Sequence, residues 1–196
     1  SNETITGKAV AIDVSRNTTG VTLTQNGVVS TDKTLPDADG DGVPDSAEPA
    51  IIGQIRFGSG ADTFNVLNGA VIGDIAFGGG ADKFRIDGGA AVVGALDSGD
   101  GQLALNIGKG SLGLSNAQAI NVTSLTLGAE SKLVFTADPT AGTNTRLVVS
   151  GAANIANGSQ LGLRLTSLLT QPTSYNVISA GSLTSGTFGQ GLLDNA

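Results

Sequence analysis

Twelve residues from Asp37 to Glu48 (DADGDGVPDSAE) place five carboxylates at the spacing of a calcium-binding loop. In such a loop, positions 1, 3 and 5 offer side-chain oxygens, position 6 is a glycine turn, position 7 offers a carbonyl, and positions 9 and 12 complete the shell. The expected ligands are therefore Asp37, Asp39, Asp41, the Val43 carbonyl, Asp45 and Glu48. So many close carboxylates repel one another unless a cation neutralises them. An oxygen-rich, flexible site favours Ca²⁺ over Mg²⁺, which requires stricter octahedral geometry.

Three prolines argue against the helices that usually flank such a loop. Pro36 precedes the loop, Pro49 follows it, and Pro44 occupies position 8. Proline breaks helices and cannot donate to a strand ladder, so both the flanking helices and loop-to-loop pairing are disfavoured. The twelve residues resemble the helix-free aspartate repeats of thrombospondin type 3 modules. A solvated acidic linker is the alternative interpretation.

A second set of carboxylates lies in a repeated unit. Residues 52–71 and 72–91 share eleven of twenty positions, and a looser third copy starts at Gly94. The segments GSGADTF and GGGADKF resemble the calcium-binding nonapeptide of repeat-in-toxin proteins, which implies Ca²⁺ at Asp62 and Asp82. The alternative is a tight glycine turn in which each aspartate caps its own backbone N–H groups. We expect stacked phenylalanine ladders beside these turns, formed by Phe57, Phe64, Phe77 and Phe84.

The elements that position these residues are short strands. Apolar residues alternate in runs such as AVAIDV and VTLTQNGVV, and no stretch shows a helical period. A repeat near twenty residues indicates a stacked solenoid. We therefore predict an all-β, right-handed, single-stranded parallel β-helix with coils of about 20 residues and a C-terminal β-hairpin cap. An antiparallel sandwich or barrel is the alternative fold.

The chain divides by composition into five segments. We read Ser1 and Asn2 as a cloning remnant. Apolar pairs continue beyond the repeats near the same spacing, with Leu105 and Ile107 followed twenty residues later by Leu125 and Leu127. The expected segments are 3–29 as N-terminal coils, 30–49 as the acidic insert, 50–112 as the repeats, and 113–196 as C-terminal coils with the cap.

Composition excludes several chemistries. The 196 residues include no cysteine or histidine, which removes thiol and imidazole nucleophiles, zinc sites built from those residues, and histidine-ligated haem. Fourteen of the seventeen acidic residues fall in the first hundred positions, and no basic stripe exists for phosphate backbones. Nucleic-acid binding is therefore not expected. No apolar run is long enough for a membrane-spanning helix, and no signal peptide opens the chain.

The C-terminal residues carry a wider resemblance. LTLGAESKLVFTADPTAGTNTRLVVSGAANIANGSQLGLRL (125–165) and SYNVISAGSLTSGTFG (174–189) resemble the stem of a bacterial autotransporter passenger, called the autochaperone region. This resemblance implies type V secretion, a Gram-negative cell surface or secreted location, and an outer-membrane β-barrel translocator in the same polypeptide. A host-cell or surface glycan or protein would be the ligand.

The expected function is thus a non-enzymatic, surface-exposed stalk whose C-terminal part assists folding, with an adhesive role and a structural Ca²⁺ loop. One alternative is a β-helix polysaccharide lyase or hydrolase. It would use residues of the repeat face, namely Asp62, Asp82, Asp74, Arg56 and Arg85. Another is the stem of a larger autotransporter enzyme with an upstream catalytic domain.

Overall fold

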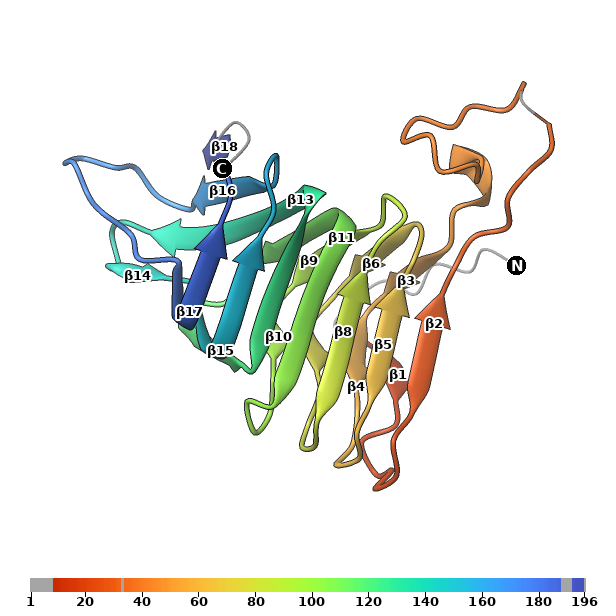
Figure 1. The fold of residues 1–196 in the computed structure, drawn as a ribbon, viewed down its shortest axis with the longest axis horizontal. Helices are drawn as coiled ribbons and strands as arrows, with labels where there is room; N and C mark the ends of the chain where they lie inside the picture. The colour runs from red at the N-terminus through yellow and green to blue at the C-terminus, as the bar shows by residue number, and fades with distance from the viewer. Residues whose placement is uncertain (1–8, 33, 188–191, 196) are drawn as a thin grey trace.

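The computed structural model describes residues 9–32, 34–187 and 192–195. Within these ranges the chain is all-β, and the single turn of 3-10 helix η1 (Asp45–Ala47) is its only helical element. The strands form a four-stranded sheet and a fourteen-stranded sheet, and one sheet is strongly curled (Figure 1). The prediction of an all-β fold is confirmed.

The smaller sheet consists of parallel strands that come from widely separated parts of the chain. Its order is β1 (Val10–Asp13), β4 (Gln54–Arg56), β7 (Ile75–Ala76) and β10 (Leu96–Asp97). Ile55 pairs with Ile75, and Ile75 pairs with Leu96. The sequence repeat therefore equals the step from one strand to its neighbour.

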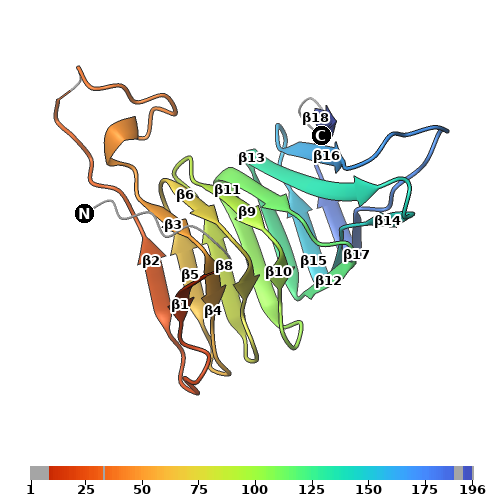
Figure 2. The same cartoon turned by 180° about the vertical axis from the view of Figure 1, so that it is seen from behind.

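The same step governs the first half of the larger sheet. Its successive neighbours are β2 (Thr22–Gln25), β5 (Thr63–Val66), β8 (Asp82–Ile86), β11 (Leu103–Leu114) and β13 (Ser124–Asp138). Phe64 pairs with Phe84, Phe84 with Leu105, and Leu105 with Leu125. Beside them run β3 (Ala50–Ile52), β6 (Ala70–Ile72) and β9 (Ala91–Gly94), which are also parallel. Figure 2 shows these strands from behind, with the insert between β2 and β3 extending from the N-terminal end.

Alternate residues of both sheets meet in one apolar core. Phe64 stacks on Phe84 with ring centroids 5.3 Å apart, and Phe57 stacks on Phe77 at 5.1 Å. All four rings are at most 3% exposed. The predicted phenylalanine ladders are confirmed, and their burial identifies them as core packing.

The turns of this half of the chain require glycine where successive turns touch. Gly78 has φ of 76°, and a Cβ atom built there would collide with the carbonyl oxygen of Gly58 in the preceding unit. Gly99 meets Gly78 in the same way at φ of 58°. Glycine alone combines a positive φ with so close an approach of backbone to backbone. The repeated GxG turns are thus a consequence of stacking.

The C-terminal half departs from the twenty-residue step. It contains β12 (Ala119–Val122), β14 (Thr143–Asn144), β15 (Arg146–Ile155), β16 (Gln160–Leu165), β17 (Ile178–Ser185) and β18 (Leu192–Asn195). Leu125 pairs with Ala153, 28 residues later, and Ala153 pairs with Leu183, 30 residues later. The expectation of a constant spacing is therefore wrong here, because segments around β14 and before β17 add residues to each step.

Two further expectations are corrected. The ladders between described strands are parallel except for β13 with β14, which excludes the antiparallel sandwich or barrel. The C-terminal β-hairpin cap is also wrong, since β17 pairs in parallel with β15 and β18 in parallel with β16. A strand added in parallel continues the ladder of its neighbour, whereas a hairpin would require β17 and β18 to pair with each other.

Candidate functional site

The acidic insert folds around the carboxylate of Asp37. Its Oδ1 accepts hydrogen bonds from the backbone N–H groups of Gly40 at 2.8 Å and Asp41 at 3.2 Å, and its Oδ2 accepts one from Gly42 at 3.0 Å. Gly40 and Gly42 have φ of 70° and 92°, the left-handed conformation that glycine adopts without strain. The DxDGDG spacing therefore bends the backbone tightly around the first aspartate.

Three of the predicted ligands lie together. Carboxylate oxygens of Asp37, Asp39 and Asp41 are all within 4.8 Å of one another, a cluster that could hold a metal ion. The Oδ1 atom of Asp41 also accepts the Val43 N–H at 2.7 Å, which fixes the third carboxylate. Oxygen-only ligands suit a hard cation.

The other predicted ligands lie outside this cluster. Asp45 Oδ1 accepts the Ala38 N–H at 2.9 Å, and the Asp45 N–H donates to the Pro36 carbonyl at 2.9 Å, so Asp45 closes the base of the loop. Glu48 follows η1, and the Val43 side chain is buried. Burial, reinforced by the charges of Asp39, Asp45, Asp41 and Asp37, raises the pKa of Glu48. Glu48 therefore senses the field of the cluster.

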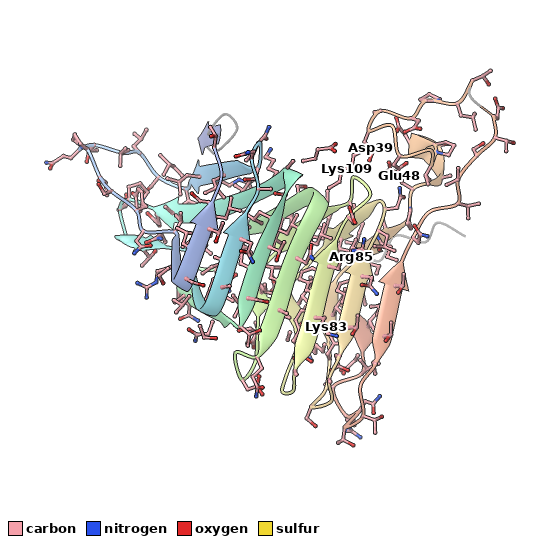
Figure 3. The ribbon with its side chains drawn as sticks, in the orientation of Figure 1. Asp39, Glu48, Lys83, Arg85 and Lys109 are labelled. Carbon is pink, nitrogen blue, oxygen red and sulfur yellow. The ribbon has the colours of Figure 1, made fainter. Side chains whose placement is uncertain are left out.

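The insert packs against the turns of the repeats, and sequence analysis missed these contacts. Asn68, only 1% exposed, donates through Nδ2 to Asp41 Oδ2. Lys109 Nζ donates to the Asp39 carbonyl at 3.0 Å (Figure 3). A Cβ atom on Gly89 would collide with Asp39 Oδ2. Three successive turns thus support the loop, and no local motif indicates partners so distant in sequence.

Asp62 and Asp82 form a buried column rather than a surface site. Both are 1% exposed, and each has an Oδ2 atom without a hydrogen-bond partner among the described residues. Asp82 Oδ1 accepts the Asp62 N–H at 2.8 Å, and Asp62 Oδ1 accepts the Val21 N–H at 2.7 Å. The prediction that each aspartate caps its own turn is wrong, since each caps the turn of the preceding coil. Calcium at this pair stays a prediction.

Burial raises the pKa of Asp82 to about 6. The charges of Asp62 and Asp100 act in the same direction, while the hydrogen bond from the Asp62 N–H opposes them. A buried carboxylate next to others favours its neutral form, because ionisation costs desolvation and like-charge repulsion. Asp82 therefore titrates in a range where ordinary aspartates are already ionised.

The residues proposed for polysaccharide cleavage do not meet. Arg56 and Asp74 line one shallow depression of about 290 Å³ on the smaller sheet. Arg85 lies on β8 of the larger sheet, and Asp62 and Asp82 are buried. Acid–base catalysis requires groups within hydrogen-bond reach of one reacting bond. The five residues do not assemble such a site.

No known protein family, curated protein or solved structure matches this chain. Among the described residues, no helix is long and apolar enough to cross a membrane.

Proposed function

We propose that this chain is a non-enzymatic stalk of an autotransporter passenger, displayed on or secreted from a Gram-negative cell. The observation that supports it is the register: Phe64, Phe84, Leu105 and Leu125 pair in succession and build one continuous core. This register favours a right-handed, single-stranded parallel β-helix. Each coil of such a solenoid contacts only its neighbours, so the chain can fold coil by coil after export.

The acidic insert is proposed to bind Ca²⁺ as a structural ion. Support comes from the Asp37, Asp39 and Asp41 oxygens within 4.8 Å and from the contacts of Asn68 and Lys109 that seat the loop on three turns. A cation would remove the repulsion between these carboxylates. The ion would then stabilise the loop and, through it, the N-terminal coils.

Residues 113–196 are proposed to assist folding of the passenger. Support comes from the long strands β13 and β15, whose partners on either side extend the core toward the C-terminus. A well-paired terminal unit can serve as the template on which the preceding coils stack. The translocating β-barrel is expected in the same polypeptide.

Surface labelling of intact cells tests the stalk. An amine-reactive, membrane-impermeant biotin reagent should modify the exposed Lys83 of the chain in its native bacterium before lysis. A periplasmic protein serves as the control and should be labelled only after lysis. Labelling of this chain only after lysis would overturn the proposal.

A further inference from the structure

The outer face of β5, β8, β11 and β13 carries two ladders of polar side chains. One ladder contains Thr63, Lys83, Ala104 and Ser124, and the other contains Asn65, Arg85, Asn106 and Thr126. Neighbouring members are about 4.8 Å apart, the spacing of paired strands. The face thus presents amide, hydroxyl and cationic groups at a regular pitch.

The centre of this face is positively charged in a chain of net charge −7. Lys83 is exposed and makes no side-chain hydrogen bond or ion pair within the described part of the chain. Arg85, whose side chain is 54% exposed, contacts Asp87 through Nη2 at 2.5 Å. A guanidinium has five N–H donors, so Arg85 retains donors for a ligand. Figure 3 shows both side chains on the outer surface of β8.

The face is also hollowed. A shallow depression of about 270 Å³ is bordered by the two cations and by Thr63, Asn65, Asn106 and Thr126. Ala104 pairs directly with Lys83, and its short side chain leaves space beside the ammonium group. The depression therefore combines two cations with uncharged hydrogen-bonding groups.

The chemistry of the face limits its ligand. A peptide strand cannot add here, because both edges of β8 are already paired, with β5 and with β11. A bilayer would need apolar side chains, which the two ladders lack. Nucleic acid needs several cations along its phosphates and would be repelled by the acidic remainder of the chain. A polymer of hydroxyl groups with interspersed anions matches the amides, hydroxyls and cations.

We propose that this face binds an anionic polysaccharide, with its carboxylate or sulfate groups at Lys83 and Arg85 and its hydroxyl groups on the Asn and Thr ladders. Consecutive sugars would lie across consecutive strands, since a sugar ring in an extended chain is about as long as the strand spacing. The inference specifies the ligand class for the adhesive role proposed above. Binding by the purified chain can be scored whether or not the chain reaches the cell surface.

The experiment titrates ¹⁵N-labelled protein with a galacturonate oligosaccharide, a heparin oligosaccharide and a neutral dextran oligosaccharide. Amide signals of β8 and β11 should shift with one or both anionic ligands and not with dextran. Whichever anionic ligand binds more tightly identifies carboxylate or sulfate as the recognised group. No binding by either, an equal response to dextran, or shifts confined to another face would overturn the proposal.

Two variants test the residues. K83Q/R85Q should weaken binding at least tenfold, while K132Q/R146Q, which removes the same number of charges elsewhere, should change it less than twofold. Ala104→Asp places a carboxylate beside Lys83 and should also weaken binding. Thermal melts confirm that each variant is folded. Equal losses in K83Q/R85Q and K132Q/R146Q would show that net charge alone is responsible and would overturn the site.

Discussion

At the scale of single residues, carboxylates with similar sequence contexts have different roles. Asp37 lies in an open loop and organises three backbone N–H groups. Asp82 accepts the Asp62 N–H inside the stack and leaves its second oxygen unpaired among described residues. Desolvation decides the difference, because a carboxylate near water keeps its charge at little cost and a buried one does not.

Asp82 should make stability fall as pH rises from about 4 to 6. Its pKa of about 6 in the folded chain lies above the ordinary value of 3.8, so the folded state binds more protons than the unfolded state in this interval. In Asp82→Asn, the free energy of unfolding should lose this decline. Urea melts at a series of pH values, compared between the variant and the wild type, measure it.

Asp138→Asn is the matched control of opposite sign. The Ser167 hydroxyl holds the pKa of Asp138 below its usual value, so this carboxylate contributes stability above pH 3.8 that is lost as pH falls. The difference between wild type and Asp138→Asn should therefore grow with pH in the acid range. A pH profile unchanged by Asp82→Asn would show that Asp82 is not the group responsible.

At the scale of elements, the acidic insert and the repeats form one supported unit. The Val43 side chain is 3% exposed, and Asn68 and Lys109 contact the loop from turns about forty residues apart. Ion binding in the loop should therefore be linked to the stability of the strands beneath it. A ligand that binds only the folded state stabilises that state by mass action.

Calcium should raise the thermal unfolding midpoint of the wild type. At a free concentration one hundred times the dissociation constant, the gain is about 2.7 kcal/mol. Asp39→Asn should abolish most of this gain, because it removes one ligand charge from the cluster. Asp32→Asn, in the same insert but outside the cluster, should retain it. Calorimetric titration and thermal melts with Ca²⁺ measure binding and stabilisation separately.

Asn68→Ala separates ion binding from its effect on the stack. It removes the donor to Asp41, so it should lower stability by about 1–3 kcal/mol and reduce the calcium-induced shift while calorimetric binding remains. Full loss of binding would instead make Asn68 part of the ion site. An equal response to Mg²⁺ would contradict the assignment of Ca²⁺.

At the scale of the whole molecule, stacking turns sequence length into physical length. Gly53 and Gly73 occupy equivalent turns, and Ile55 pairs with Ile75. Inserting two further copies of residues 54–73 should therefore add two coils in register. The β-helix proposal requires this modularity, because each coil contacts only its neighbours.

The insertion should lengthen the particle by about 10 Å, since each coil adds one strand spacing. Small-angle X-ray scattering measures the maximum dimension, and circular dichroism should show added β-structure with cooperative melting retained. Inserting ten residues instead of a full unit should destabilise the stack, because it displaces Ile75 from Ile55. An in-register insertion that leaves the length unchanged would contradict a solenoid.

Sequence alone determined the local periodicities. Phe64 could be placed over Phe84, and Leu105 under Leu125, because identical spacing makes identical residues stack. The Asp37, Asp39 and Asp41 spacing likewise predicted a carboxylate cluster, since the turn that joins them is formed within five residues. Such features depend on neighbours in the chain or on exact repetition.

Only the tertiary structure decided what depends on closure between distant segments. It buried Asp62 and Asp82 and brought Asn68 to Asp41. It also lengthened the later steps to 28 and 30 residues, and it left Lys83 and Arg85 facing outward beside Ala104. Periodicity states which residues alternate, whereas solvent exposure and charge environment follow from which strands lie next to one another. Those two properties determine where this chain can bind an ion or a polysaccharide.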